Sequence, residues 1–129
     1  MSHRFELTVY YEDTDMGGIV YYANYLKFIE RARSTWVAQL GVDQLALQAE
    51  GVVFAVRSIR AEYLAPARLG DLLEVVSHRQ SSTPARWILR QEVQRAGQVL
   101  FTAEVTIMAL TAAGKPTRLP AELRRNSNP

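Results

Sequence analysis

The sequence contains no cysteine among its 129 residues, which excludes disulfide bonds, thiolate nucleophiles and cysteine-ligated zinc. Histidine is scarce too, and His3 and His78 lie too far apart in the chain to form a histidine-built metal site. No apolar run approaches the roughly 20 residues of a membrane-spanning helix. The first residues also lack the apolar core of a secretion signal. We therefore expect a cytoplasmic protein without a transmembrane segment.

Most of the chain lacks an excess of charge of either sign. Residues 1–114 carry 11 Lys and Arg against 12 Asp and Glu, so the formal net charge of +2 comes from residues 115–129. A nucleic-acid-binding protein usually concentrates positive charge on a folded face. The balanced body therefore argues against a nucleic-acid partner. Hydrophobic residues make up 48% and charged residues 22%, which is typical of a globular domain.

Internal repeats, low-complexity tracts and linkers rich in Gly, Pro or Ser are also missing. The length suits one ordinary domain. We expect a single domain over residues 1–115, followed over residues 116–129 by a polar, basic tail with little to bury.

One segment has the periodicity of a long helix. Apolar residues recur at spacings of three and four over residues 25–40, which predicts an amphipathic helix of about 16 residues. Asn24 is placed to cap its start, and Gly41 to adopt the left-handed conformation at its end. A shorter helix is expected over residues 43–50.

The pattern in the rest of the chain predicts strands joined by short turns. Alternating or β-rich patterns predict strands over residues 5–11, 52–63, 71–78, 87–93 and 99–109. Short turns favour antiparallel pairing, and the apolar stripe of the helix must cover one sheet face. The sequence therefore predicts an α+β fold with an antiparallel sheet. A sheet edge or face remains for a second copy of the chain.

Unusual residues are densest just before the long helix. Glu12, Asp13 and Asp15 stand on a loop with Gly17 and Gly18, and the N-terminus of the helix follows. A carboxylate can act as general base or nucleophile on a carbonyl, while free N–H groups of the helix hold the oxyanion. The alternative is an acidic turn that only complements the helix dipole. No carboxylate closes a calcium loop here, so no metal is expected.

The same region resembles a known family. The motifs are VYYEDTD at residues 9–15, GIVY at 18–21, ANYL at 23–26, ERAR at 30–33 and EYLAPARLGD at 62–71. Together they resemble the signature of hotdog-fold acyl-CoA thioesterases, of which the YbgC type is the nearest branch and the 4-hydroxybenzoyl-CoA thioesterases are close relatives. The resemblance covers roughly residues 5–120. It implies a hotdog fold, in which an antiparallel β-sheet wraps around one long central α-helix.

The resemblance also implies roles for individual residues. It makes Asp15 the catalytic carboxylate and the backbone N–H of Tyr22 the group that polarises the carbonyl. The YbgC branch often has His where this chain has Tyr22, whereas the 4-hydroxybenzoyl branch has Tyr. Glu30, on the helix, is a reserve candidate for the carboxylate. The further predicted substrate contacts are Gly17, Gly18, Ile19, Val20 and Tyr25, together with Arg79 and Arg86 for the phosphates of coenzyme A.

The resulting hypothesis is an acyl-CoA thioesterase in which Asp15 is general base or nucleophile. Coenzyme A is part of the substrate and no separate cofactor is expected. The family implies a homo-oligomer, dimer or tetramer, with active sites at the dimer interface. The sequence leaves open which acyl chain is preferred and whether an acyl-carrier-protein thioester is also a substrate. The alternative is a non-catalytic acyl-thioester or acyl-carrier-protein binding module of envelope lipid metabolism. Dehydration is disfavoured, because hotdog dehydratases usually bring His to the site.

Overall fold

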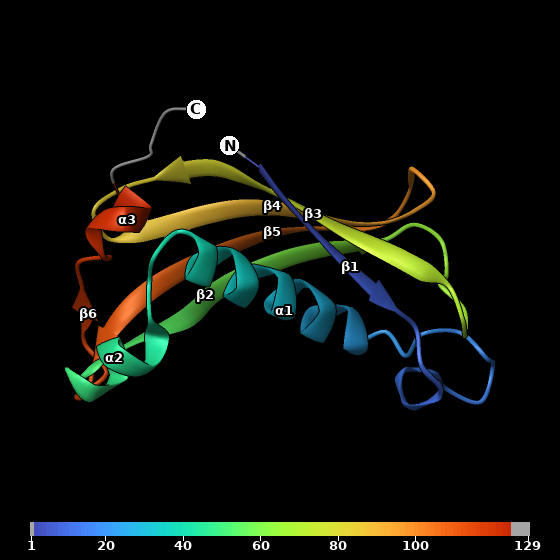
Figure 1. Ribbon diagram of the computed structural model, residues 1–129, viewed down its shortest axis with the longest axis horizontal. Helices are drawn as coiled ribbons and strands as arrows, with labels where there is room; N and C mark the ends of the chain where they lie inside the picture. Colours follow the sequence, from blue (N-terminus) through green and yellow to red (C-terminus); the bar gives the residue numbers. More distant parts are fainter. Residues whose placement is uncertain (1, 125–129) are drawn as a thin grey trace.

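The computed structural model describes residues 2–124 as a six-stranded antiparallel sheet with helices packed against it (Figure 1). The strand order is β1-β3-β4-β5-β2, and β6 pairs with β5 off this path. The elements in chain order are β1 (Ser2–Thr8), the 3-10 helix η1 (Tyr11–Asp13), α1 (Asn24–Gln39), α2 (Gln44–Ala49), β2 (Val52–Tyr63), β3 (Leu72–Ser82), β4 (Arg86–Arg95), β5 (Gln98–Thr111), β6 (Pro116–Thr117) and α3 (Ala121–Arg124). The antiparallel α+β prediction is confirmed.

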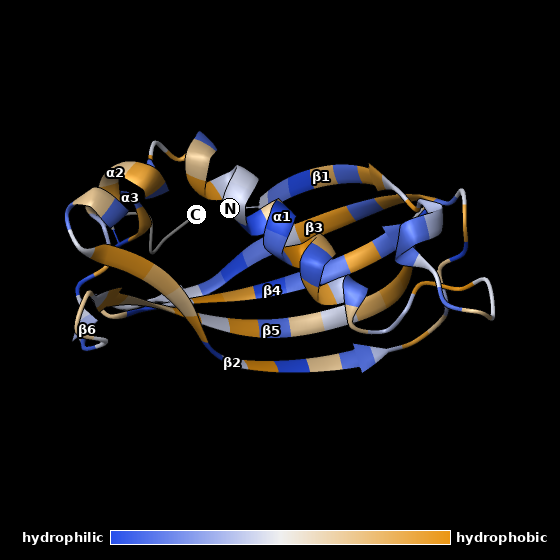
Figure 2. Cartoon of the chain, turned by 90° about the horizontal axis from the view of Figure 1, so that it is seen from below, coloured by the Kyte–Doolittle hydropathy of each residue, from blue (hydrophilic) through white to orange (hydrophobic). Residues whose placement is uncertain are grey.

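Helix α1 lies across one face of the sheet, as Figures 1 and 2 both show. Its 16 residues match the predicted length, and its apolar stripe is buried against the strands. The buried members of the stripe are Tyr25, Phe28, Ile29, Ala32, Trp36 and Val37. Across from them, Trp87 of β4 and Phe101 of β5 are also buried. Burial of this stripe, rather than intrinsic helix propensity, supplies most of the stability of such a helix.

The predicted cap of this helix is wrong at its start and right at its end. Ala23 is the N-cap residue, and no side chain caps it. Asn24 is already helical, and its side-chain amide donates to the Asp13 carbonyl at 2.9 Å. The amide therefore ties the acidic loop to the helix instead of capping it. Gly41 has a φ of 96°, the left-handed conformation predicted for it.

The first strand ends earlier than predicted. It runs over Ser2–Thr8, and the chain turns into η1 where the alternating pattern continues to Tyr11. The reason is local competition for the backbone: the Asp13 carboxylate accepts the Tyr10 N–H at 2.9 Å. Tyr10 and Tyr11 are consequently exposed rather than alternating in and out of the core.

Strand β2 forms one edge of the described sheet, because only β5 pairs with it. It is 12 residues long, and most of its side chains are exposed. Val53, Val56 and Ile59 are among the exposed large apolar residues of the chain. A long edge strand with exposed apolar side chains is the kind of edge that another strand can extend.

The predicted tail buries more than expected. Residues 116–117 pair with β5, and Leu119 and Leu123 are each 1% exposed. The Ser82 hydroxyl donates to the Leu123 carbonyl at 2.9 Å and fixes α3 to the end of β3. The charged residues around Leu119 and Leu123 gave this segment a polar composition, and the prediction of a tail with little to bury followed that composition. Residues 125–129, the remainder of the predicted tail, lie outside the described residues. Across residues 2–124, no helix has the length and apolar character needed to cross a membrane.

Candidate active site

The acidic loop that precedes α1 is closed by its own backbone. Thr14 bridges to Val20, and the Asp15 N–H donates to the Ile19 carbonyl at 2.9 Å. The Asp15 carboxylate accepts the Gly17 N–H at 2.8 Å, and its side chain is exposed. A Cβ on Gly17 would come within 3.2 Å of Asp15 Oδ1. Gly17 therefore leaves room for this carboxylate, which is held by the main chain yet open to a ligand.

Asp13, the other acid of the Asp-Thr-Asp motif, has a different environment. It is buried, and its carboxylate accepts the Tyr10 N–H. Its carbonyl accepts the Tyr21 N–H and the Asn24 side-chain amide, both at 2.9 Å. These bonds give Asp13 a structural role. The carboxylates of Asp13 and Asp15 accept different N–H groups. Within residues 2–124, no group of three His, Asp or Glu side chains is placed to hold a metal ion.

A free backbone donor stands at the start of α1. The Tyr21 N–H is bonded to Asp13, and the Asn24 N–H donates to the Tyr21 carbonyl at 2.8 Å. Between them, the Tyr22 N–H has no hydrogen-bond partner within the described part of the chain. The first N–H groups of a helix lack intrahelical acceptors and carry its positive dipole end. The Tyr22 peptide is therefore suited to receive a carbonyl oxygen.

Aromatic side chains form the wall beside this donor. Tyr25 stacks on Phe101 with ring centroids 5.0 Å apart, and Tyr63 meets Tyr25 edge-on at 5.5 Å. The Tyr63 hydroxyl donates to the Tyr22 carbonyl at 2.9 Å, while the Tyr25 hydroxyl accepts the Ala67 N–H at 3.0 Å. Burial raises the pKa of both Tyr25 and Tyr63. Both hydroxyls therefore stay protonated at neutral pH and serve as hydrogen-bonding groups.

An open, largely apolar cavity of about 370 Å³ lies between this wall and the loop. Four residues predicted as site residues line it, namely Ile19, Val20, Tyr22 and Tyr25. Tyr63 and Leu64 line it as well, and sequence reasoning gave them no role. The only signal was their place in the EYLAPARLGD motif at residues 62–71, because the sheet register that carries Tyr63 to Tyr22 is not visible in the sequence.

Two predicted contacts lie elsewhere in the chain. Leu72, at the start of β3, pairs with Thr8 close to the acidic loop, whereas Arg79 is seven residues further along this strand. That spacing corresponds to roughly 23 Å. Arg86 begins β4 beyond the following turn, at the same far end of the sheet. Within one chain the structure therefore does not bring these arginines to Asp15, and their contact with coenzyme A stays a prediction.

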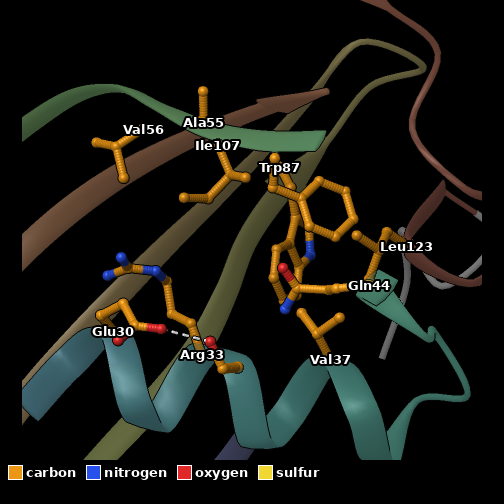
Figure 3. A pocket seen from close by; sticks show the side chains of 11 residues that line it. Glu30, Arg33, Val37, Gln44, Ala55, Val56, Trp87, Ile107 and Leu123 are labelled. Atoms are coloured by element: carbon orange, nitrogen blue, oxygen red, sulfur yellow. Dashed lines mark hydrogen bonds between the residues drawn. The ribbon is translucent and has the colours of Figure 1, made fainter. Parts of the chain in front are cut away.

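Glu30 lines a second cavity, of about 170 Å³, between the middle of α1 and strand β2 (Figure 3). Its walls combine apolar residues such as Val37, Val56 and Trp87 with the polar Ser34 and Gln44. Arg33 points into the same cavity beside Glu30, as Figure 3 shows. Glu30 is thus separate from the cavity that Tyr22 and Tyr63 line in its own chain, since the two cavities share no lining residue; Asp15 lines neither of them.

Comparisons with known proteins show the family of the chain. The family model of the thioesterase-like superfamily matches residues 9–126. The acyl-CoA thioester hydrolase YbgC of Escherichia coli O157:H7 is 40% identical over 122 residues, which cover 93% of this chain and 91% of that protein. A probable thioesterase from Bartonella henselae has a TM-score of 0.87 at 34% identity, covering 93% of this chain and all of that one.

A further solved structure shows the likeness of fold alone. Slr0204 from Synechocystis, a 1,4-dihydroxy-2-naphthoyl-CoA thioesterase, has a TM-score of 0.89 at 22% identity, with 100% of both chains covered. The hotdog fold implied by the sequence motifs is confirmed by these neighbours. A match over most of the chain, together with a relative at 40% identity, establishes that the chain belongs to the thioesterase-like superfamily of thioester hydrolases.

Proposed function

We propose that the chain is an acyl-CoA thioesterase whose reaction takes place between Asp15 and the N-terminus of α1. One observation carries this proposal: the exposed, main-chain-held carboxylate of Asp15 stands on a loop bonded to Ile19, and Ile19 lines the same open apolar cavity as Tyr22 with its free N–H. The names of the relatives, acyl-CoA thioester hydrolase and acyl-CoA thioesterase, support it. Coenzyme A enters as part of the substrate, and the route below uses no other cofactor.

In the proposed reaction the thioester carbonyl oxygen accepts the Tyr22 N–H, which stabilises the developing oxyanion. Along one route Asp15 takes a proton from water, and the resulting hydroxide adds to the carbonyl carbon. The tetrahedral intermediate then expels the coenzyme A thiolate, which is protonated, and leaves the free acid. Along the other, Asp15 attacks directly, expels the thiolate and forms a mixed anhydride that water hydrolyses. Both routes need the ionised carboxylate of Asp15.

The Tyr22 side chain has a different task from its peptide group. A tyrosine hydroxyl, with a reference pKa of about 10, is a poor general base at neutral pH. The exposed Tyr22 ring instead packs edge-on to Tyr63, with ring centroids 6.1 Å apart, and forms part of the cavity wall. The main chain polarises the carbonyl, and the ring shapes the space for the acyl group.

We further propose a homodimer built on the β2 edge, alone or doubled into a tetramer. A strand that pairs with its own copy antiparallel over its full length places Val52 opposite Tyr63 of the partner subunit. Tyr63 lines the same cavity as Tyr22, and Val52 lies at the opposite end of β2. Each active site would therefore lie at the interface. A cytoplasmic location, and acyl-carrier-protein thioesters as second substrates, belong to the same proposal.

The decisive experiment measures free-thiol release from a panel of acyl-CoAs by wild type and Asp15→Asn. We expect Asp15→Asn to lose a hundredfold or more, which is about 2.7 kcal/mol of transition-state stabilisation. Glu12→Gln, at an exposed acid of the same loop, is the matched control and should keep its activity. If wild type binds acyl-CoA but releases no thiol, or Asp15→Asn equals wild type, the chain is a binding module or uses another catalyst.

A further inference from the structure

The Arg33 guanidinium is anchored on one side only. Its Nη1 donates to Gln91 Oε1 at 3.0 Å, and no carboxylate of the described residues lies within ion-pair distance of it. Gln91 is fully buried, and its amide nitrogen donates to the Ile29 carbonyl at 3.0 Å and to Ser77 Oγ at 2.9 Å. Because two donor bonds fix the Gln91 amide, its oxygen holds Arg33 in one place.

The free side of the guanidinium faces the cavity beneath β2 (Figure 3). Burial lowers the pKa of Arg33, and nearby Glu30 raises it. A partly desolvated guanidinium with unused N–H donors is a strong site for a carboxylate, which it can bind in a bidentate fork. Glu30 is exposed, and its Oε2 accepts the Ser34 hydroxyl at 2.5 Å on the same helix. Its charge opposes an anionic ligand and weakens the site without filling it.

Most of the remaining lining of the cavity is apolar, although Ser34 and Gln44 add two polar side chains. Phe54, Trp87 and Ile107 line it together with Val37 and Val56. A ligand that fits this volume is therefore apolar along its length and anionic at the end that meets Arg33.

The proposed dimer brings this cavity to the reaction site. Pairing of β2 with its own copy places Phe54 opposite Ala61 of the partner subunit. Phe54 then lies about 7 Å along the strand direction from Tyr63 of the partner subunit, the residue that lines the cavity of the proposed reaction site. Within one chain, the two cavities are roughly 23 Å apart along β2, from Val56 to Tyr63, but only about 7.5 Å apart along α1, from Glu30 to Tyr25. Both arrangements are therefore compared in the test with mixed dimers.

We propose that the cavity of one subunit receives the far end of the acyl group bound at Asp15 of the other, and that Arg33 there binds a terminal carboxylate. The favoured substrates are then coenzyme A thioesters of dicarboxylic acids. This inference rests on the proposed thioesterase activity and on the β2 dimer.

The first test compares acyl-CoAs of equal length with and without a terminal carboxylate, for example adipoyl-CoA against hexanoyl-CoA, and glutaryl- to sebacoyl-CoA against their monocarboxylic counterparts. Wild type should favour at least one dicarboxylic member in kcat/KM. Arg33→Met should lower that preference by about tenfold to a hundredfold while hexanoyl-CoA turnover is kept. Arg33→Lys, which keeps the charge and can still donate to Gln91, should retain part of the preference. Glu30→Gln should increase it, because one opposing charge is removed.

The second test asks whether Arg33 acts across the interface. Asp15→Asn and Arg33→Met chains carrying different tags are co-expressed, and the mixed dimer is purified. One of its two sites then combines an intact Asp15 with an intact Arg33 of the other chain. Adipoyl-CoA turnover should recover to about half of the wild-type value per dimer.

Three results would overturn the inference and leave the proposed function standing. Wild type could hydrolyse hexanoyl-CoA with no preference for any dicarboxylic thioester. Arg33→Met could leave the preference unchanged. The mixed dimer could fail to recover adipoyl-CoA turnover, which would place Arg33 in the site of its own chain. Failure of wild type to hydrolyse any acyl-CoA would instead refute the thioesterase proposal itself.

Discussion

At the scale of single residues, side-chain hydroxyls and rings fix the main chain around the reaction site. Tyr63 comes from the end of β2, yet its hydroxyl bonds the carbonyl of Tyr22, 41 positions earlier. The N–H proposed to hold the oxyanion belongs to the same residue as this carbonyl. The bond fixes the main chain just before α1, where intrahelical hydrogen bonds do not yet hold it.

Tyr63→Phe keeps the ring packing and removes this bond alone. We expect kcat to fall by about fivefold to tenfold, in line with the worth of one hydrogen bond, with little change in KM. Steady-state kinetics on the best acyl-CoA measure the effect. Tyr11→Phe removes an exposed hydroxyl and is the control. Equal kcat in Tyr63→Phe and wild type would show that the bond does not position the donor.

We expect His3 to make the stability of the chain depend on pH. Its ring stacks on Trp36 at 5.8 Å, and its buried Nδ1 has no partner among the described residues. Burial lowers its folded-state pKa below 6.5, and a contact with Gln39 partly offsets this. The unfolded chain therefore binds the proton more tightly than the folded chain. The contribution of neutral His3 is complete above about pH 6.5 and is lost as the pH falls through the folded-state pKa.

The check is the unfolding free energy from urea titrations at pH 7.5 and 5.5, for wild type and His3→Phe. Phenylalanine can keep the stacking and cannot titrate. Wild type should lose more stability than His3→Phe between the two pH values. The same loss in both proteins would mean that other groups cause it.

At the scale of elements, short segments pack against the ends of the sheet, and long strands form its centre. The helix α3 has only four residues, yet Leu123 is buried against the end of the sheet and lines the Arg33 cavity. The Leu119 N–H donates to the Pro84 carbonyl at 2.8 Å and fixes the segment before it. This segment is part of the folded core in spite of its polar composition.

Leu123→Ala should therefore destabilise the chain by about 2 to 4 kcal/mol, because it empties a buried site that the four-residue helix cannot refill. Chemical denaturation gives the value directly. Ala121→Gly, at an exposed position of the same helix, controls for the loss of helix propensity and should cost about 1 kcal/mol or less. A loss below that of the control would show that the end segment contributes no core packing.

The elements also show how far the sequence predicts the structure. The 3-to-4 spacing placed α1 to within a residue at its ends, and alternation found β5, because both signals are local. The acidic loop and its glycines were likewise found from local chemistry. The Tyr63–Tyr22 and Arg33–Gln91 contacts were missed, since they join segments 41 and 58 residues apart through the sheet register. No local pattern encodes that register.

At the scale of the whole molecule, the exposed apolar side chains of β2 form the interface of the proposed dimer. Val53, Val56 and Ile59 all lie on this edge, whereas β1 at the opposite edge has no exposed large apolar side chain. Each edge strand also forms one ion pair with its neighbour, Arg60–Glu104 at β2 and Arg4–Glu74 at β1. Charged residues on an edge strand discourage pairing with another strand, and apolar ones permit it. The two edges of the sheet therefore differ in their capacity to associate.

Light scattering coupled to size exclusion should find wild type at twice the monomer mass or a multiple of that value. Ile59→Lys should shift the mass toward the monomer and reduce thiol release with it, since the proposed site needs both subunits. Gln98→Lys adds the same charge at an exposed position of the β4–β5 hairpin and should change neither property. A fully active Ile59→Lys monomer would contradict the interface site.

The strand order also has a consequence for the way the chain folds. Strands β3, β4 and β5 follow one another as hairpins and can pair as soon as they are synthesised, whereas β2 must wait for β5, more than 30 residues later. Until β2 docks, Tyr63 cannot reach the start of α1. The proposed catalytic loop is therefore completed late, only after β5 has been synthesised. A nascent or truncated chain without β5 lacks the bond that positions the proposed donor, so we expect full activity only once β2 has paired with β5.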